Sequence, residues 1–292
     1  MLTRRCAQRQ FLLRPDEETN NVFLYCLIEA ALRFKIVLLL PQMMSNHHHL
    51  VFFDPDGNAI AFYQHFHTQL AKCQNALRGR WENLWAAEEV CLVELMTPDD
   101  VMDKLVYVAM NPVKDGLVER VHHWPGPPTV SALLNRRTLR ARRPCHYYRE
   151  NGVMPAEVEI DLEIPAALGE RSAVLDALRS RIALAEASFA EDRQREQRYV
   201  LGRRRVLRQS WRDKPKSVAL RRNLRPRVAA KDPEIRVAAL ERNRQFARDY
   251  RESRSLWLRG LHSLFPPGTY WLHRFANVGV APLQAATALH DN

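Results

Sequence analysis

Residues 34–53 read FKIVLLLPQMMSNHHHLVFF, and this stretch decides the kind of fold that the chain can adopt. Two apolar runs, at 34–40 and 50–53, are short and rich in leucine, valine and phenylalanine, which is typical of buried β-strands. Three histidines stand between them. The longest apolar run, IVLLLPQMM, is too short and too interrupted to span a bilayer. We therefore expect two paired strands, in a soluble protein without a membrane partner.

The segments around these runs alternate strand-like and helical patterns. The next helix has a clear start, because Thr97 is a favoured N-cap residue, Pro98 suits the first helical position, and two acids follow. We expect it to continue over 101–110 and to stop at Pro112. Further strands are expected at 3–13 and 88–95, and further helices at 21–32 and 60–77. Together these elements predict an α+β fold with a mostly antiparallel sheet.

Charge is distributed unevenly along the 292 residues, which carry a formal net charge of +11. Between Leu201 and Arg254 there are 18 basic and 6 acidic residues, so this window holds the whole positive excess. Such a concentration favours a phosphate-facing surface and hence a nucleic-acid partner, with a solvated helix face as the alternative.

The segments PGPPTV, after Trp124, and NRRTLRARRP indicate a domain boundary. We predict an α+β domain at 1–125, a linker with a short strand at 126–168, and a helical basic extension at 169–292. The five cysteines are scattered without a C-x-x-C pair, which favours a reducing, cytoplasmic location over a disulfide scaffold or a thiolate zinc site. No dinucleotide, P-loop or G-x-S-x-G motif is present.

The histidines at 47–49 form the first candidate site. On a strand, His47 and His49 project from one face and His48 from the other, so two imidazoles are positioned to hold one divalent cation. A polar strand edge without a ligand is the alternative. His65 and His67 have the same spacing, but they lie in a predicted helix, where residues two apart cannot share a metal.

A second candidate feature lies on the helix that begins after Thr97. Tyr107 and Asn111 are four residues apart and therefore share one face, where a phenol and an amide could approach the same phosphate. Lys104 lies one turn before Tyr107 and could act as a base, or it could be an ordinary solvated lysine. A tyrosine in the sequence LVYVAMNP could equally be a core residue.

Three motifs in this order resemble the REP-associated branch of the single-tyrosine HUH transposases: NHHHL at 46–50, RWENLW at 80–85, and YVAMNPVKDGLVERVHHWP at 107–125. The resemblance covers about residues 1–125 and implies a ferredoxin-like antiparallel sheet with H-x-H on its central strand. It also implies Tyr107 as the catalytic nucleophile, and His47, His49 and Asn111 as ligands of Mg²⁺ or Mn²⁺. Two departures are His48, where that family usually has a bulky apolar residue, and AAEEV after Trp85, where basic residues are expected.

The function implied by this resemblance is a metal-dependent transposase or strand-transfer nuclease. It would cut single-stranded DNA beside a hairpin through a 5′-phosphotyrosine intermediate, without ATP, as a monomer or a homodimer. Trp211, Trp257, Tyr270 and Trp271 could stack on bases, although core packing is expected for Trp257 and Trp271. The residues expected to bind nucleic acid are Arg203, Arg204, Arg205, Arg208, Arg212, Lys214, Lys216, Arg221, Arg222 and Arg225.

Two other functions remain open at this point. A domesticated relative could bind hairpin DNA or RNA without cutting it, and would then bind in a strongly salt-dependent way without needing a metal. A regulatory protein could use the histidines for a structural metal, and chelation would then unfold it.

Overall fold

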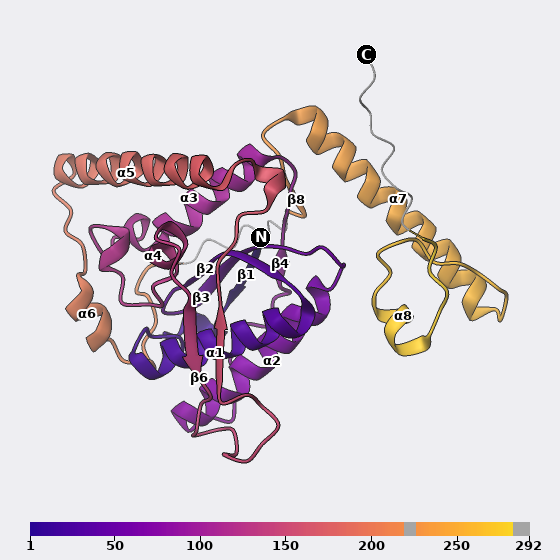
Figure 1. The fold of residues 1–292 in the computed structure, drawn as a ribbon, viewed down its shortest axis with the longest axis horizontal. Helices are drawn as coiled ribbons and strands as arrows, with labels where there is room; N and C mark the ends of the chain where they lie inside the picture. The colour runs from indigo at the N-terminus through magenta and orange to yellow at the C-terminus, as the bar shows by residue number, and fades with distance from the viewer. Residues whose placement is uncertain (219–225, 283–292) are drawn as a thin grey trace. The chain divides into compact units, whose positions relative to one another are not determined.

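The computed structural model describes residues 1–218 and 226–282, which are drawn in colour in Figure 1. The chain divides into two compact units, of which the first spans Met1–Ala229 and the second begins at Ala230. The domain limits predicted from the sequence, after residues 125 and 168, both lie inside the first unit. Helices from the region expected to form a separate extension therefore belong to the same unit as the N-terminal sheet.

The centre of the first unit is a four-stranded antiparallel sheet. Its strands, in spatial order, are β2 (Val37–Met43), β3 (His47–Phe53), β1 (Leu2–Arg5) and β4 (Cys91–Leu92). β2 and β3 contain the apolar runs predicted as strands, and the side chains of Leu38, Leu40 and Leu50 are buried. The mixed α+β class predicted from the sequence is confirmed.

Two helices, α1 (Glu17–Phe34) and α2 (Ala59–Arg78), pack against each other and cover one face of this sheet (Figure 1). α1 begins where the side chain of Asp16 accepts a hydrogen bond of 2.9 Å from the backbone N–H of Thr19. Phe23 of α1 and Phe66 of α2 meet edge to face, with 5.6 Å between the ring centroids. The main apolar core therefore lies between these helices and the sheet.

The helix α3 (Pro98–Lys114) packs against β2 and β3. It begins with the predicted cap: the hydroxyl of Thr97 accepts a hydrogen bond from the backbone N–H of Asp100, and the carboxylate of Asp100 accepts one from the backbone N–H of Thr97. The expectation that Pro112 stops the helix is wrong, because the helix continues to Lys114. A proline this close to a helix end removes only one hydrogen bond, and the N–H of Asp115 still reaches the carbonyl of Asn111 at 3.0 Å.

The helix α5 (Arg171–Arg195) lies beside α3 (Figure 1). A guanidinium nitrogen of Arg181 is 3.1 Å from the carboxylate of Asp103, and the carboxylate of Glu186 accepts a hydrogen bond of 2.7 Å from the backbone N–H of Val121. These contacts join a helix of the predicted extension to the N-terminal part. Besides a short two-stranded pair, the elements described in the first unit outside this sheet include η1 (Ala7–Arg9), η2 (Val121–His123), α4 (Thr129–Leu134), β6 (Leu139–Arg142), β7 (Glu157–Ile160), η3 (Ala166–Leu168) and α6 (Arg203–Arg208).

Two strands differ from the sequence-based expectation. The strand expected at 3–13 ends at Arg5, and the 3-10 turn η1 follows it. The strand expected at 88–95 divides into β4, in the main sheet, and β5 (Glu94–Leu95), which pairs in parallel with β8 (Val228–Ala229). The second partner lies more than 130 residues away along the chain, so local periodicity could not indicate this pairing.

The second unit, taken by itself, contains α7 (Pro233–Leu258) and α8 (Trp271–Ala276). The carboxylate of Asp232 caps α7 by accepting a hydrogen bond of 2.8 Å from the backbone N–H of Glu234. Phe265 is fully buried against Tyr250, with 5.5 Å between the ring centroids. Within the described part of the chain, no helix combines the length and apolar character needed to cross a bilayer.

Candidate functional site

His47 and His49 share one face of β3, as the strand pattern predicts. Their ring centroids are 4.9 Å apart and the rings are nearly perpendicular, at 85°. The sheet register places Thr3 of β1 opposite His49 and Arg5 opposite His47. The two imidazoles therefore form a close pair held by a central strand of the sheet.

The Nδ1 atom of each of these rings is hydrogen-bonded to a protein oxygen. His47 Nδ1 is 2.7 Å from Asn46 Oδ1, and His49 Nδ1 is 2.7 Å from the hydroxyl of Thr3. A metal-binding histidine commonly uses one ring nitrogen in this way while the other binds the cation. Because Nδ1 is engaged in both rings, Nε2 is the nitrogen through which either ring could bind a cation.

Burial keeps both imidazoles in the neutral form that a cation requires. It lowers the pKa of His47 to about 4, against a hydrogen bond with Asn111 that raises it. Burial also lowers the pKa of His49 well below its usual value, helped by the charges of Lys114 and Lys104. At pH 7 neither ring needs to lose a proton before it can bind a cation.

The side chains of Tyr107 and Asn111 reach this pair from α3. The rings of Tyr107 and His49 meet edge to face, with 5.6 Å between centroids at 78°. The amide of Asn111 donates a hydrogen bond of 3.2 Å to the backbone carbonyl of Tyr107, and it also bonds to the side chain of His47. Tyr107 is 36% exposed whereas Asn111 is buried, so a phenol accessible to solvent stands beside a buried polar set.

Two lysines of α3 flank this tyrosine. Lys104 Nζ and Lys114 Nζ lie 5.6 Å and 4.9 Å from the centroid of the Tyr107 ring. Because the two amines approach the same ring, the phenol lies in a positive field. That field favours an approaching phosphate.

The donor set at this site consists of two neutral imidazoles and one amide. Within the described residues, no group of three or more histidine, cysteine, aspartate and glutamate side chains is placed to hold a metal ion. The set fits a divalent cation that takes its remaining oxygen ligands, and its charge balance, from a bound phosphodiester and water. The sequence predicted all four side chains, and the structure brings them together from β3 and α3.

His48 has a role that sequence reasoning missed. It projects to the opposite face, as predicted, and is fully buried among Phe23, Phe66 and Trp85. Its Nε2 atom lies 2.9 Å from Nε2 of His67, so these two residues form a buried pair. The apolar context of His67, in YQHFHTQL, gave the only sequence signal for this burial.

The protons of this pair can be assigned from its partners. A guanidinium can only donate, so Arg4 Nη1, at 3.0 Å, donates to His67 Nδ1. Neutral His67 then carries its proton on Nε2 and donates it to His48 Nε2, which places the proton of His48 on Nδ1. That atom is buried without a hydrogen-bond partner in the structure. His65 instead pairs with Glu29 at 2.6 Å, consistent with the expectation that His65 and His67 do not share a metal.

Residues 202–217, here called the basic strap, carry seven of the ten predicted nucleic-acid contacts. The strap starts at the turn that follows α3, where the backbone N–H of Gly202 donates to the carbonyl of Leu117 at 2.9 Å. It continues to the loop between β1 and α1, where the N–H of Phe11 donates to the carbonyl of Asp213 at 2.9 Å. The side chains of the seven predicted residues are all exposed: Arg203, Arg204, Arg205, Arg208, Arg212, Lys214 and Lys216.

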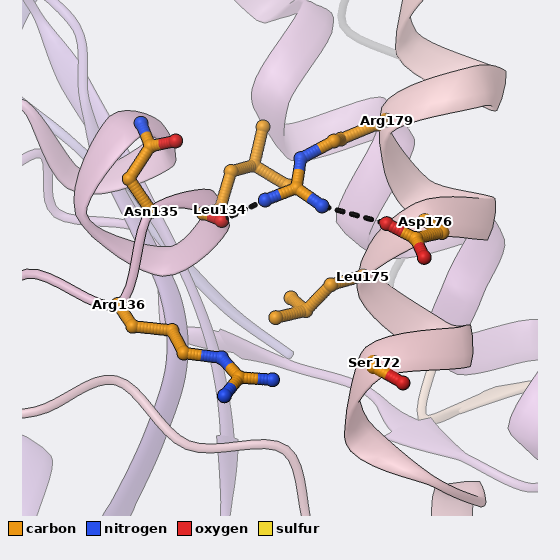
Figure 2. Close-up of a pocket in the computed structure, with 7 residues that line it drawn as sticks. All are labelled: Leu134, Asn135, Arg136, Ser172, Leu175, Asp176 and Arg179. Atoms are coloured by element: carbon orange, nitrogen blue, oxygen red, sulfur yellow. Dashed lines mark hydrogen bonds and ion pairs between the residues drawn. The ribbon is translucent and has the colours of Figure 1, made fainter.

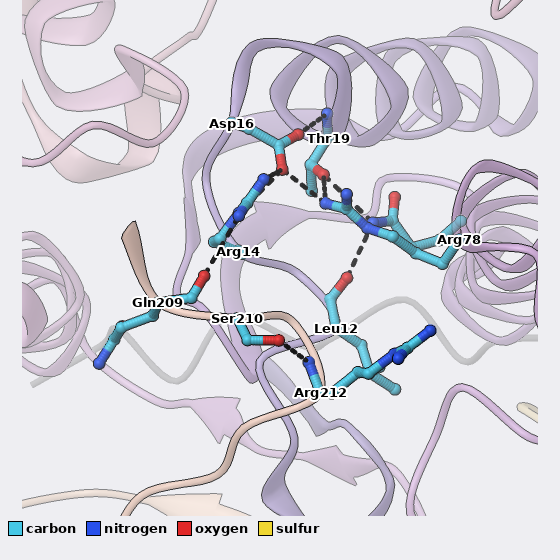
Figure 3. A network of polar contacts seen from close by, with 9 residues as sticks. Leu12, Arg14, Asp16, Thr19, Arg78, Gln209, Ser210 and Arg212 are labelled. Carbon is cyan, nitrogen blue, oxygen red and sulfur yellow. Dashed lines mark hydrogen bonds and ion pairs between the residues drawn. The ribbon is translucent and has the colours of Figure 1, made fainter. Parts of the chain in front are cut away.

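A polar network fixes the middle of this strap (Figure 3). Arg14 donates to the carbonyl of Gln209 at 3.2 Å and forms an ion pair with Asp16 at 2.7 Å, and Asp16 also pairs with Arg78 at 2.6 Å. A separate connection joins the end of the strap to the candidate site: the guanidinium of Arg9 donates to Ser217, and Asn46, beside His47, donates to the carbonyl of Arg9 at 3.1 Å. The remaining predicted contacts, Arg221, Arg222 and Arg225, lie outside the described residues.

The four aromatic residues proposed for stacking have different surroundings. Trp211 is half-buried on the basic strap, between the guanidinium carbons of Arg212 and Arg80 at 4.9 Å and 5.9 Å from its ring. Tyr270, Trp257 and Trp271 belong to the second unit. Core packing was expected for Trp257 and Trp271, yet they are 38% and 57% exposed.

A shallow pocket lies elsewhere, between the end of α4 and the start of α5 (Figure 2). Arg179 crosses it, pairing with Asp176 at 2.7 Å and donating to the carbonyl of Leu134. These partners occupy its guanidinium, and the pocket shares no lining residue with the histidine and tyrosine site.

The comparisons with known proteins found no match among the family models, the curated proteins or the solved structures.

Proposed function

We propose that this protein is a metal-dependent transposase or strand-transfer nuclease that cuts single-stranded DNA through Tyr107. The observation that carries the proposal is the approach of the Tyr107 ring to His49, together with the hydrogen bond between Asn111 and His47. These four residues come from two motifs about 60 residues apart, and they are the residues that the resemblance to single-tyrosine HUH transposases implies.

The arrangement of the sheet supports the same family. The order along the chain is β1, α1, β2, β3, α2, β4, and the spatial order is β2, β3, β1, β4. We interpret it as a ferredoxin-like palm, in which the H-x-H motif lies on a central strand and the tyrosine helix packs on the face that this motif occupies.

In the proposed reaction the phenol oxygen of Tyr107 attacks the phosphorus of a DNA phosphodiester. A bond forms between that oxygen and phosphorus, and the bond from phosphorus to the 3′ oxygen breaks. The upstream strand leaves, and its 3′ oxygen takes a proton from solvent to become a hydroxyl. The phenol proton passes to solvent. The 5′ end remains as a phosphotyrosine, and attack by another 3′-hydroxyl reverses the step without ATP.

His47, His49 and Asn111 have the binding role in this proposal. A Mg²⁺ or Mn²⁺ ion held by them would polarise the non-bridging phosphate oxygens and stabilise the leaving 3′ oxygen. Thr3 and Asn46 hold the two imidazoles in orientation through Nδ1. Because α3 and β3 of one chain supply all four side chains, we propose that one protomer can carry out the cleavage.

The basic strap is proposed to bind the phosphates of a hairpin beside the cut. Each phosphate contact should contribute about one unit to the slope of log K against log salt. We expect Arg203→Ala to weaken binding similarly for all sequences and to lower that slope. Arg140→Ala is the matched control, because Arg140 is exposed but already pairs with Glu159 at 3.0 Å.

The decisive experiment incubates the full chain with a labelled library of single-stranded hairpins and Mn²⁺, followed by denaturing electrophoresis. We expect a protein-linked DNA band that disappears in Tyr107→Phe and in the presence of EDTA, while Tyr107→Phe still binds DNA. A band that persists in Tyr107→Phe would overturn the assignment of the nucleophile. Tight, salt-sensitive binding that needs no metal and gives no band would instead favour a hairpin-binding protein that cuts nothing.

A further inference from the structure

The loop between α2 and β4 displays one tryptophan to solvent and buries another. Trp81 is 98% exposed, whereas Trp85, four residues later, is 8% exposed and donates a hydrogen bond of 3.0 Å to the carbonyl of His67. Exposing a whole indole to water is unfavourable, and nothing in the apolar core requires an aromatic residue at position 81. The exposed indole of Trp81 is therefore available to contact a ligand.

The loop that carries Trp81 is held on both sides by hydrogen bonds. Asn75 donates to the carbonyl of Glu82 at 2.7 Å, and the backbone N–H of Ala7 donates to the carbonyl of Leu84 at 2.9 Å. The N–H of Arg80 reaches the carbonyl of Asn75 at 2.9 Å. Because the backbone on either side is fixed, the indole of Trp81 is presented from a defined position.

This loop contacts the basic strap through Arg80. The guanidinium of Arg80 lies over the ring of Trp211 and donates to the side-chain oxygen of Gln10 at 3.3 Å. Gln10 in turn donates to the backbone carbonyl of Arg212 at 3.2 Å. The loop containing Trp81, the loop after β1, and the strap therefore form one continuous surface.

The same surface borders the proposed cleavage site. The N–H of Ala86 donates to the carbonyl of Arg5 at 2.9 Å, and Arg5 lies opposite His47 in the sheet. The N–H of Cys6 donates to the carbonyl of Asn46 at 2.7 Å. Backbone hydrogen bonds therefore join the loop that carries Trp81 to the chain segments on either side of His47.

We propose that Trp81 and Trp211, with Arg80 and Arg212, form a base-stacking platform for the single-stranded DNA that flanks the cut. The inference rests on the proposed function and adds a substrate-binding surface to it. Flat aromatic rings and guanidinium planes bind the π-faces of unpaired bases without reading their sequence, and paired bases offer no such face. Arg5, Arg9, Arg80, Arg212, Lys214 and Lys216 outnumber the acidic Glu82, Glu88, Glu89 and Asp213 here, and this positive excess suits a phosphate backbone.

The test measures binding of the full chain to a short oligothymidylate by fluorescence anisotropy, with Tyr107→Phe as the background to prevent cleavage. Trp81→Ala should weaken binding about tenfold, since that is the usual loss for one stacked base, and Trp81→Phe should restore most of it. Tyr199→Ala is the matched control, because Tyr199 is 95% exposed on the same unit. We expect that control to stay within about twofold of the parent protein.

A second ligand distinguishes the contribution of base stacking to binding from the contribution of phosphate charge. An abasic oligomer of the same length keeps the phosphates and removes the bases, so Trp81→Ala should bind it as tightly as the parent protein does. Equal binding of oligothymidylate by Trp81→Ala and its parent would overturn the inference, as would an equal loss on the abasic oligomer. A change of oligomeric state in Trp81→Ala with unchanged DNA binding would assign this surface to contacts between copies and would also overturn it.

The outcomes for the two proposals can be distinguished. If Trp81→Ala binds DNA normally while the chain with Tyr107 intact forms the covalent adduct, the stacking inference fails and the proposed function stands. If the platform binds single strands through Trp81 but no adduct forms, the inference stands as a binding surface and the proposed cleavage fails.

Discussion

β3 carries histidines on both of its faces, and the surroundings give the two pairs different properties. On the face toward α3, His47 and His49 bond through Nδ1 to oxygens and lie beside an exposed phenol and two lysines. On the face toward α1 and α2, His48 bonds to His67, and aromatic rings enclose both. Burial lowers the pKa of all four residues, so the pKa values alone would not separate the pairs.

The neighbouring groups make the difference. The first pair has a phenol, an amide and two lysines around it, which are the groups that the proposed reaction on a DNA phosphate requires. In the second pair, three of the four ring nitrogens bond to each other or to Arg4, and the fourth, Nδ1 of His48, is buried in the core without a partner, so none of them faces an external ligand. We infer that His47 and His49 serve the proposed chemistry, whereas His48, between them in the sequence, contributes to stability. Each of the following substitutions should then alter either the proposed chemistry, measured as adduct formation or Mn²⁺ affinity, or the free energy of unfolding. The other property should stay nearly unchanged.

The largest expected effect is on the α3 face. His47→Ala should reduce formation of the covalent DNA adduct by roughly 1,000-fold, about 4 kcal/mol in transition-state stabilisation, because one ligand of the proposed cation is lost. Urea unfolding should show little change, since His47 is only half-buried. Single-turnover adduct formation on a hairpin substrate checks this. An adduct rate within about tenfold of the parent rate would contradict the ligand role of His47.

The second substitution is on the core face, and it should lower stability while leaving metal binding unchanged. His67→Ala should lower the free energy of unfolding by about 3 kcal/mol, because it opens a cavity and leaves nitrogens of Arg4 and His48 without a partner. Mn²⁺ affinity of the folded protein should be retained. Urea denaturation and calorimetric titration with MnCl₂ measure the two properties.

His65→Ala is the control for this core substitution. His65 lies on the same helix and is partly exposed, and Glu29, its partner, keeps an ion pair with Arg33 at 2.6 Å. A loss of about 1 kcal/mol is expected there. Equal losses for the two variants would mean that the pairing of His48 with His67 contributes nothing particular to stability.

The third prediction concerns pH and rests on His67. Burial holds its pKa well below 6.5, and His48 and Arg4, which face it, lower it further. The unfolded chain therefore binds a proton below pH 6.5 that the folded chain does not. The stability that depends on neutral His67 is complete above pH 6.5, and it falls as the pH drops, by at most about 1.4 kcal/mol per pH unit for one histidine.

Urea denaturation at pH 7.5, 6.5 and 5.5 tests whether the free energy of unfolding falls as the pH drops. The free energy of unfolding of His67→Gln should depend less on pH than that of the parent. Below pH 6.5 the variant should take up as much as one proton fewer on unfolding. Titration of the ring proton signals by NMR gives an independent readout in the unsubstituted chain. A pKa of His67 at or above 6.5 in the folded protein would contradict the prediction.

The sequence was sufficient to predict which side chains lie on the α3 face of β3, because these predictions depend only on residues close together in the chain. Alternation along a strand determines that His47 and His49 share a face, and helical spacing determines that Tyr107 and Asn111 do. The apolar runs at 34–40 and 50–53 and the cap at Thr97 likewise depend on neighbours within a few residues. These features account for the sheet, the tyrosine helix and the candidate site.

The features that the sequence did not reveal depend on contacts between distant segments. His67 was correctly separated from His65, but its bond to His48 requires the packing of α2 on β3. The pairing of β5 with β8 and the docking of the basic strap on the loop after β1 join residues more than 130 positions apart. Trp81 and Trp85 look alike in RWENLW, and only the packed loop distinguishes the exposed indole from the buried one.

The smallest expected effect compares the groups that orient each pair. Thr3→Val removes the hydroxyl that lies 2.7 Å from Nδ1 of His49 and keeps the shape of the side chain. Mn²⁺ affinity should fall about tenfold, as is usual when a group that orients a metal-binding histidine is lost, and Thr3→Ser should restore it. Arg4→Met makes the corresponding change on the other face, because Arg4 orients His67, and it should lower stability without changing Mn²⁺ affinity. Calorimetric titration with MnCl₂ in the absence of DNA measures all three variants. Unchanged affinity in Thr3→Val, or an equal loss in Arg4→Met, would mean that the two faces of β3 are not functionally separate.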